Sequence, residues 1–472
     1  MARSWATFGV DLHLEPTGPR LRRGLTDALR EAVRGGRLPS GARLPSSRSL
    51  AADLGIARNT VAEAYADLVA EGWLTARQGS GTRVAEGRQV PPPGVRPHRP
   101  ERPRPAYDLR PGTPDLGSFP RAEWLRAARR ALTAAPSDAL GYGDPRGRTE
   151  LRTALAGYLA RTRGVRADPG HLVICGGFAH GLKLLTTVLR ARGTRTIAVE
   201  SYGLDEHRLL LTAAGLATTP LPVDGQGADP GPLKDAGAVL LTPAHQFPMG
   251  VPLRHDRRAA VVDWARHTGG LVLEDDYDGE FRYDRQPVGA LQGLGPDHVV
   301  YLGTASKSLA PGLRLGWMVL PPDVVGEVAA AKGGVDTCGV LDQLTLAEFI
   351  TSGAYDRYVR AARLRYRRRR DALVAALAAR APGIRVTGIA AGLHAVLRLP
   401  PGTQDAVVRA AARQGLALDG LTRRYRHPDA VDEPPDALVV GYGTPPDHAW
   451  AGALDALCTA LREALSDREN AS

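Results

Sequence analysis

The first part of the chain carries apolar residues at helical spacing. A stripe at four-residue intervals predicts one helix, which ends at the glycine pair Gly35-Gly36. The residues of this stripe are Leu21, Leu25, Leu29 and Val33. The pattern then predicts two more helices, over residues 47–54 and 58–71, joined by a short turn that contains Gly55. A helix, a tight glycine-containing turn and a second helix form the spacing of a helix-turn-helix.

The next residues, WLTARQGSGTRVA (73–85), favour a β-hairpin. Two short strand-like runs flank a turn of glycine and small polar residues around Gly79. A hairpin directly after a helix-turn-helix is typical of a wing. We therefore predict a winged helix-turn-helix over residues 1–84.

The pattern changes after this unit. Residues 87–105, GRQVPPPGVRPHRPERPRP, are dense in Pro and Arg and poor in aliphatic residues, which predicts an extended spacer. We assign a linker to residues 85–107 and a larger domain to residues 108–472. In the larger domain, short apolar runs alternate with longer helix-like segments. The runs are HLVIC, TIAVE, AVLLT, GLVLEDD and HVVYLGT.

Both faces of each run are apolar, as in strands of a parallel sheet that helices cover on both sides. From about Tyr366 onward the pattern becomes a long Arg-rich helix followed by the strands GIRVTGI, GLHAVLRL and DALVVGYG. This change predicts a second, smaller α+β lobe. The predicted fold class is α/β, with a winged helix-turn-helix joined to a large lobe with a parallel or mixed sheet and a small lobe.

Composition excludes several classes of protein. The chain has 472 residues, of which 43% are hydrophobic and 24% charged, which is typical of globular proteins. No apolar run reaches the roughly 18 residues of a spanning helix, and the N-terminus lacks the pattern of a signal peptide. The cysteines are Cys175, Cys338 and Cys458. They are odd in number and scattered, so they predict neither a disulfide framework nor a cysteine-based metal site. These features predict a cytoplasmic protein.

Charge narrows the chemistry further. The net charge of +11 permits a nucleic-acid partner without proving one, because nearly all basic residues are arginines. The lysines are Lys183, Lys234, Lys307 and Lys332. Chemistry that needs a lysine amine therefore has only these positions.

Candidate DNA contacts lie at three places in the predicted winged helix-turn-helix. They are Arg48, Arg58, Asn59, Thr60, Gly79, Ser80 and Gly81. The start of the second helix would enter the major groove, with its first residues facing bases and phosphates. The arginine at the start of the preceding helix can bind a phosphate, and the wing tip lets the backbone approach the minor groove.

Residues 44–85 resemble the winged helix-turn-helix of GntR-type bacterial repressors over nearly its full length. The resemblance implies binding to a double-stranded DNA operator. One departure is Ala57, which stands where the family usually has Ser. Loss of a capping serine costs about 1 kcal/mol. The alternative is a helix-turn-helix that serves packing only.

Candidate cofactor chemistry centres on Lys307 in VVYLGTASKSLAPGLRLGW. A cofactor held as a Schiff base, such as pyridoxal 5'-phosphate (PLP), needs one lysine amine near groups that balance a phosphate dianion. The hydroxyls of Thr304 and Ser306 and the guanidinium of Arg314 offer that balance. The alternative is a surface lysine in a serine-rich loop.

Three other segments fit the same cofactor. In GLVLEDDYDGEFRY, Asp275 and Asp276 alternate faces at a strand end, so only one can face a pyridine nitrogen and keep it protonated. In ICGGFAHGL, the amides near Gly177, Phe178 and Ala179 can hold a phosphate at a helix N-terminus. Tyr202, at another strand end, is positioned to stack on the pyridine ring, or simply packs.

Together, residues 108–442 resemble fold-type I aminotransferases. With the GntR-like unit and the Pro/Arg linker, the whole chain resembles the MocR group of transcriptional regulators. The resemblance implies PLP as cofactor and a homodimer with PLP sites at the subunit interface. It selects Asp275 over Asp276, because Asp and Tyr stand two apart in the family, and it places Tyr277 at the phenolic oxygen of PLP. It also implies that Tyr142 reaches the phosphate in the partner subunit.

Two departures from aminotransferases favour a regulator. Phe247, in Gln-Phe-Pro-Met-Gly, replaces an Asn that hydrogen-bonds the cofactor oxygen, and Val439 stands where enzymes place an Arg for the substrate carboxylate. The interpretation is a PLP-dependent regulator that senses PLP or an amine or amino-acid effector. The alternatives are an active aminotransferase with a DNA-binding module and a DNA-binding protein without cofactor. Arg423, Arg424 and Arg426 are candidates for an effector carboxylate, or a solvated arginine surface.

Overall fold

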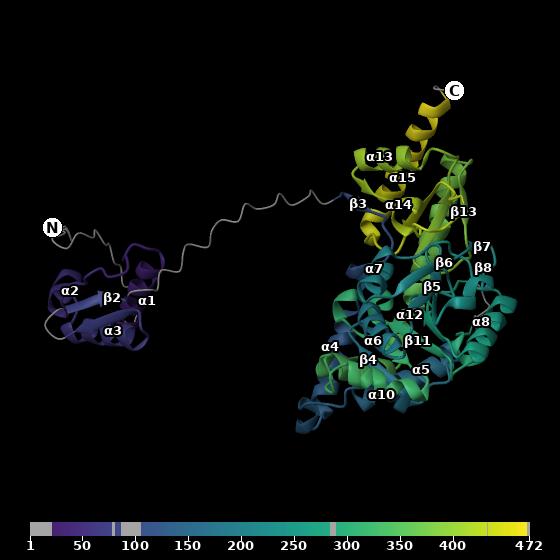
Figure 1. Ribbon diagram of the computed structural model, residues 1–472. Helices are drawn as coiled ribbons and strands as arrows, with labels where there is room; N and C mark the ends of the chain where they lie inside the picture. Colours follow the sequence, from purple (N-terminus) through teal and green to yellow (C-terminus); the bar gives the residue numbers. More distant parts are fainter. Residues whose placement is uncertain (1–20, 78–80, 86–104, 284–288, 432, 470–472) are drawn as a thin grey trace. The chain divides into compact units, whose positions relative to one another are not determined.

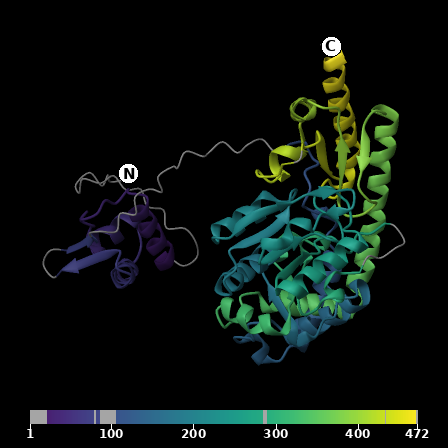
Figure 2. The same cartoon turned by 45° about the vertical axis from the view of Figure 1, so that its right-hand side comes forward.

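The computed structural model describes residues 21–77, 81–85, 105–283, 289–431 and 433–469. The chain divides into two structural units, Met1–Arg104 and Pro105–Ser472, which Figure 1 and Figure 2 show from two directions. Most of the proposed linker and the wing-tip residues Gly79 and Ser80 lie outside the described residues.

The N-terminal unit is a winged helix-turn-helix. Its elements are α1 (Leu21–Arg34), α2 (Ser47–Leu54), α3 (Arg58–Ala70), β1 (Leu74–Arg77) and β2 (Gly81–Val84). The strands pair antiparallel, with Leu74 opposite Val84, and close a core to which all three helices contribute. The predicted helices and hairpin are confirmed. Leu21 begins α1 and is 47% exposed, whereas Leu25, Leu29 and Val33 of the same stripe are buried in the core.

The two helices of the helix-turn-helix begin differently. The Ser46 side chain caps α2 by accepting a hydrogen bond from the Ser49 amide at 3.1 Å. The helix ends at Gly55, whose φ of +67° lies in the left-handed region that favours glycine. At the start of α3, Ala57 makes no side-chain cap bond. The first turn of α3 therefore lacks the capping hydrogen bond that α2 has.

Replacing Ala57 with serine is expected to stabilise α3. Ala57 already has the extended backbone of a capping residue, with φ −64° and ψ 137°, so a serine oxygen can accept a helix amide without backbone change. A gain of about 1 kcal/mol would slow hydrogen exchange of the α3 amides in the full chain about fivefold. The control is Ala66→Ser, on the exposed side of the same helix, which is expected to give no protection. Equal exchange in Ala57→Ser and the native chain would contradict the capping argument.

The C-terminal unit is built around a seven-stranded sheet with the order β4-β12-β11-β10-β9-β5-β6. The strands are β4 (Leu172–Cys175), β5 (Thr196–Glu200), β6 (Ala217–Leu221), β9 (Ala238–Leu241), β10 (Leu271–Asp275), β11 (Val299–Thr304) and β12 (Gly316–Val319). All neighbours are parallel except that β12 runs antiparallel to β11 and β4. The five predicted runs are therefore confirmed as strands of one mixed sheet.

Helices cover both faces of this sheet because side chains alternate along its strands. Leu172 and Ile174 of β4 face a core with α5, α11 and α12, whereas Val173 and Cys175 face a core with α6 and α10. The helices of the large lobe, apart from α12, are α4 (Arg121–Ala134), α5 (Thr149–Arg163), α6 (Phe178–Ala191), α7 (Asp205–Ala213), α8 (His255–Thr268), α9 (Ala305–Ser308), α10 (Pro322–Ala331) and α11 (Val340–Thr351).

The small lobe has a four-stranded sheet with the order β13-β14-β17-β16. Its elements are β13 (Arg385–Thr387), β14 (His394–Arg398), α13 (Gln404–Arg413), β16 (Asp419–Gly420), α14 (Leu421–Tyr425), β17 (Ala437–Gly441) and α15 (Trp450–Glu469). The long helix α12 (Ala354–Arg380) begins before the predicted position near Tyr366. The reason is that it serves both lobes: Val359 packs in a core of the large lobe and Leu373 in that of the small lobe.

Short strands complete the unit: β3 (Tyr107–Asp108) pairs with β15 (Leu416–Ala417), and β7 (Val223–Asp224) pairs with β8 (Gly227–Ala228). None of the helices within the described residues combines the length and the apolar character needed to cross a membrane.

Candidate functional site

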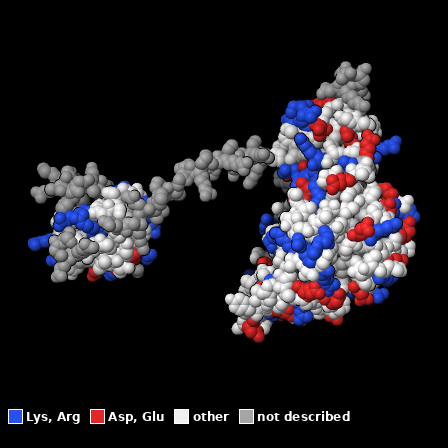
Figure 3. Space-filling view, in the orientation of Figure 1, with Lys and Arg blue, Asp and Glu red and all other residues white. Residues whose placement is uncertain are grey.

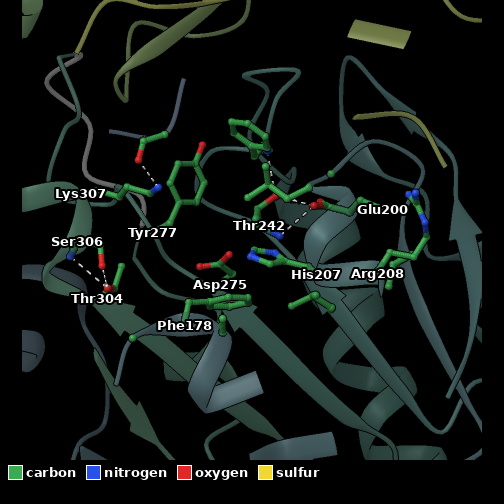
Figure 4. Close-up of a pocket in the computed structure, with 18 of the residues that line it drawn as sticks. Phe178, Glu200, His207, Arg208, Thr242, Asp275, Tyr277, Thr304, Ser306 and Lys307 are labelled. Carbon is green, nitrogen blue, oxygen red and sulfur yellow. Dashed lines mark hydrogen bonds between the residues drawn. The ribbon is translucent and has the colours of Figure 1, made fainter. Parts of the chain in front are cut away.

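A cavity of about 250 Å³ lies in the C-terminal unit, at the carboxyl ends of the central strands (Figure 4). This edge of a parallel sheet is where ligands bind in open α/β folds. The structure brings ten of the predicted cofactor residues to the wall of this cavity. They are Gly177, Phe178, Ala179, Tyr202, Asp275, Tyr277, Thr304, Ser306, Lys307 and Arg314. Tyr142 does not line the cavity and is 99% exposed.

Lys307 lies on the short helix α9, directly after β11. The Thr304 hydroxyl caps this helix by accepting a hydrogen bond from the Ser306 amide at 3.1 Å. The Lys307 amine donates to the carbonyl oxygen of Gly112 at 2.5 Å, and Figure 4 shows it beside the Tyr277 ring. Burial lowers the pKa of Lys307, although Asp275 and Asp278 oppose that effect. A larger fraction of the amine is therefore neutral and nucleophilic at a given pH.

Asp275 reaches the cavity because of its position in β10. It shares a face with Leu273, whereas Asp276 follows on the opposite face and binds Arg163 at 2.7 Å and the Tyr301 hydroxyl at 2.7 Å. Asp275 Oδ1 is buried and has no hydrogen-bond partner. Burial raises the pKa of Asp275 well above its usual value, and the Lys307 charge works in the opposite direction. The site thus holds a buried carboxyl oxygen that lacks a hydrogen-bond partner.

The start of α6 and the residues after α9 form a narrow cradle. Gly177 has φ +95°, and a Cβ on Gly316 would come within 2.8 Å of the Gly177 Cα, so both positions require glycine. Arg314 has φ +51° and is the one non-glycine residue with positive φ among the described residues. Such strain is common where a side chain is held for a ligand. Free amides at the start of α6 and the Arg314 guanidinium suit a phosphate group.

A second group of polar residues, which the sequence did not reveal, backs Tyr277. His245 Nδ1 lies 2.7 Å from Asp278 Oδ2 and 3.2 Å from the Tyr277 hydroxyl. His394 packs its ring 5.0 Å from that of His245. These two histidines and Asp278 place their candidate ligand atoms within 4.8 Å of one another, but each already hydrogen-bonds protein atoms. Burial lowers the pKa of His394 to about 3, so its imidazole is neutral.

The opposite wall holds further residues that the sequence did not indicate. The His207 ring lies 4.4 Å from that of Phe178, and burial lowers the pKa of His207 to about 4. Glu200 accepts hydrogen bonds from the Thr242 amide and hydroxyl, and burial raises its pKa to about 7. Arg208 also lines the cavity. Glu200 ends β5, Thr242 follows β9, and His207 and Arg208 lie on α7, and the sequence context of these four residues has no motif.

The sequence candidates for an effector carboxylate lie elsewhere. Arg424 pairs with Glu206 at 2.9 Å, Arg426 donates to the Ala430 carbonyl oxygen at 2.7 Å, and Arg423 is exposed. None of the three lines the cavity. Val439 is fully buried in a core between β14, α14 and β17 and does not line it either.

In the N-terminal unit, most of the described candidate DNA contacts are exposed to solvent. Arg48 on α2 and Arg58 and Asn59 on α3 are exposed, Thr60 is half-buried, and Gly81 is the exposed first residue of β2. Figure 3 shows basic side chains on the face of this unit that the view presents. Exposed arginines at a helix start can reach DNA without any rearrangement of the core.

Comparison with known proteins assigns each of the two units to a known family. Residues 21–84 match the family of bacterial regulatory proteins of the gntR type, and residues 108–424 match aminotransferase class I and II. The chain is 34% identical over 425 residues to the pyridoxine biosynthesis transcriptional regulator PdxR of Corynebacterium glutamicum, covering 89% of this chain and 91% of the relative. It is 32% identical to the probable rhizopine catabolism regulatory protein MocR of Rhizobium meliloti, covering 89% and 90%. The chain belongs to the MocR-type regulators of the GntR family.

Solved structures relate the larger unit of this MocR-type chain to aminotransferases. Kynurenine aminotransferase of Pyrococcus horikoshii superposes with a TM-score of 0.67 at 25% identity, over 75% of this chain and 90% of the enzyme. LysN, the α-aminoadipate aminotransferase of Thermus thermophilus, has the same fold, with a TM-score of 0.67 at 24% identity over 76% of this chain and 92% of that one. The predicted fold class, including the fold-type I aminotransferase domain, is confirmed.

Proposed function

We propose that this MocR-type regulator binds PLP in the cavity around Lys307 and changes its DNA binding in response to PLP or to an amine or amino-acid effector. The observation that carries the proposal is the buried Oδ1 of Asp275, which has no partner in a cavity that also holds Lys307. A pyridinium N–H would supply the missing donor, and a buried acceptor without a donor is costly. We place this function in the cytoplasm, with the DNA.

Each part of PLP has a matching group in the cavity. Gly177, Phe178, Ala179, Thr304, Ser306 and Arg314 would hold the phosphate, Tyr277 the phenolic oxygen, Tyr202 the ring and Lys307 the aldehyde carbon. When bound, PLP supplies an electrophilic carbon and an electron sink. Asp275 holds a proton at the pyridine nitrogen, and the lowered pKa of Lys307 keeps more of its amine neutral for attack.

Two positions support sensing rather than turnover. Phe247 lines the cavity and packs edge-on against Tyr277 and Tyr425, so its side chain offers no hydrogen bond to a ligand. Val439 lies in the core, where enzymes of this fold would need an arginine. An active aminotransferase is the second candidate function, favoured by the presence of Lys307 and Asp275 in one cavity.

Arg208 supports an effector that carries an acid group. It lines the cavity from α7, and Figure 4 shows it on the side opposite Lys307. The structure gives its guanidinium no hydrogen bond or ion pair with any described residue, whereas nearby Glu200 is bound by Thr242 and Gln246. A half-buried cation without a protein partner suits a ligand anion.

Arg208→Gln is expected to weaken binding of amino acids about tenfold and to leave binding of the corresponding simple amines unchanged, because one charge-assisted hydrogen bond is lost. Titration of PLP-loaded protein with L-leucine and with isopentylamine measures the difference. Arg423→Gln, an exposed arginine outside the cavity, is the control. Equal loss for both ligands would remove Arg208 from acid recognition.

We also propose a homodimer. Large apolar side chains lie exposed on α4 and the residues after it: Leu125 is 67%, Leu132 52%, Leu140 58% and Tyr142 99% exposed. Exposed large apolar side chains are common at protein–protein contacts, and these four lie within 18 residues of the chain. A second copy of the chain would cover it, and Tyr142 would then reach toward the partner's cavity. A monomeric mass in light scattering, with PLP bound, would contradict this part of the proposal.

DNA binding with and without PLP tests the function as a whole. An operator selected from random DNA by the full-length protein would be titrated with PLP-free and PLP-loaded protein, then with amines added. We expect PLP or the amine to shift the operator Kd, because an effector must bind the two states of the regulator differently. The same Kd under all conditions would contradict a sensing role.

A further inference from the structure

Tyr277 is backed by a buried His–Asp pair that lies on the segments following two neighbouring strands. His245 follows β9 and Asp278 follows β10, and their side chains are 3% and 2% exposed. His245 Nδ1 lies 2.7 Å from Asp278 Oδ2 and 3.2 Å from the Tyr277 hydroxyl oxygen. The three side chains thus form one hydrogen-bonded group whose outer member, Tyr277, lines the cavity.

The hydrogen bonds of this group depend on which atom carries the hydrogen between His245 and Asp278. With His245 Nδ1 as the donor, the contact of 2.7 Å is a hydrogen bond that Asp278 Oδ2 accepts. That nitrogen cannot then accept a hydrogen from Tyr277. The phenol is neutral, because burial and the nearby negative charge of Asp278 raise the pKa of Tyr277 well above its usual value. Its hydrogen has two destinations: the carboxylate of Asp278 or the cavity.

We propose that His245 is a positioning residue: by donating to Asp278, it leaves the Tyr277 hydroxyl free to donate into the cavity, to the phenolic oxygen of PLP. The inference rests on the proposed function. It also accounts for Phe247, whose ring meets that of Tyr277 edge-on at 5.9 Å and brings no donor of its own. An amide at position 247 would donate a hydrogen bond to the phenolic oxygen of PLP. With Phe247 there instead, that hydrogen bond must come from Tyr277, whose hydroxyl the His245–Asp278 pair orients.

The surroundings hold the pair in place. Gly392 has φ +71°, and a Cβ there would overlap both Asp278 and the His245 ring, so the backbone closes directly over the pair. His394 Nε2 donates to the Pro248 carbonyl oxygen at 3.0 Å and packs against His245 from the other side. The other charged or titratable groups around Tyr277 are Asp275, Glu200, Lys307 and His394.

The absorption of bound PLP, followed against pH, reports whether its phenolic oxygen receives a hydrogen bond. In His245→Leu, Asp278 is free to take the Tyr277 hydrogen, and the phenolic oxygen loses its donor. We expect the pH midpoint to rise by about one unit, the size of one hydrogen bond to a charged group. His245→Asn keeps an N–H donor near the Nδ1 position and is expected to retain the native midpoint. Asp278→Asn removes the competing carboxylate and is expected to lower it.

A double-mutant cycle with Tyr277→Phe shows whether His245 acts through Tyr277. Tyr277→Phe alone is expected to raise the midpoint at least as far as His245→Leu does. Adding His245→Leu to Tyr277→Phe should then give no further shift, because the hydroxyl that His245 orients is already gone. An additional shift of the same size would mean that His245 acts directly on PLP and would overturn the inference.

The outcomes separate this inference from the proposed function. If the native protein shows no PLP band at all, the proposed function fails and the inference fails with it. If the native protein binds PLP and His245→Leu keeps the native midpoint, only the inference is overturned. Should His245→Leu fail to fold, Asp278→Asn and His245→Asn decide, and an unchanged or raised midpoint in Asp278→Asn overturns it.

Discussion

Lys307→Ala is expected to abolish covalent attachment of PLP and to leave DNA binding partly intact. Lys307 is the one lysine that lines the cavity. Lys332 is committed elsewhere, because its buried amine binds Asp336 at 2.7 Å and two backbone carbonyl oxygens. Because the proposed DNA contacts lie in the other unit, we expect the loss of one amine in the cavity to leave the helix-turn-helix intact. Borohydride reduction followed by mass spectrometry measures attachment, and an operator titration measures DNA binding.

Lys183→Ala is the matched control for this experiment, since Lys183 is exposed on α6 and does not line the cavity. It should retain PLP at the native level. Loss of the whole fold in Lys307→Ala, seen as loss of cooperative thermal unfolding, would contradict the modular organisation. PLP still attached in Lys307→Ala would remove Lys307 from its proposed role.

Arg58→Ala is expected to weaken operator binding between tenfold and a hundredfold, or about 1–3 kcal/mol, which is the value of one good contact to a base. Arg58 is the exposed first residue of α3, at the end of the helix that would enter the major groove. Since it is exposed and is not part of the core of this unit, its loss should change neither folding nor the absorption of bound PLP. A titration at fixed salt measures the effect, because phosphate contacts make affinity depend on salt.

The matched control for Arg58 is Arg23→Ala, an exposed arginine on α1 of the same unit. This variant removes the same charge from α1, which is not the helix expected to enter the major groove. Its loss of operator affinity should therefore be several-fold smaller. Equal losses in both variants would mean that the unit binds DNA by charge alone. Unchanged affinity in Arg58→Ala would remove Arg58 from the DNA-contacting surface.

Local sequence rules were sufficient for the strands and for the expectation that only one of two adjacent acids faces the site, whereas the choice of Asp275 came from the family resemblance. The apolar runs became strands because both faces of each are buried, and the alternation along β10 sends Asp275 and Asp276 to opposite sides. Thr304 and Lys307 could be placed because the first ends one of these runs and the second follows it within three residues. Parallel strands end at the same edge of a sheet, so residues at their carboxyl ends meet even when they are far apart in the chain.

The wall behind Tyr277 could not be predicted in this way. His245, Asp278 and His394 come from loops and strands of two lobes, and only the packing of the lobes brings them together. A single histidine in a sequence carries no signal of its neighbours. The start of α12 was placed too late for a related reason: its first turns pack on the large lobe, whereas the prediction followed only the arginines of its middle.

The acid-binding candidates show the limit of a composition argument. In so arginine-rich a chain, Arg423, Arg424 and Arg426 had no feature that set them apart from surface, and the structure pairs or exposes them. Arg208 could not be predicted as a ligand-binding residue, because it lies within an ordinary helix sequence. The structure shows that α7 lines the cavity and that Arg208 is part of its wall.

The central claim is that Lys307 and Asp275 form a PLP site used for sensing. The visible absorption spectrum of the purified protein with PLP, titrated with amines and amino acids, tests it most directly. We predict a band of protein-bound PLP that is absent in Lys307→Ala and that amines shift reversibly, with no net transfer of the amino group to a keto acid. Rapid transfer from one amino acid to a keto acid would make the protein an aminotransferase, and no bound-PLP band at all would contradict the account.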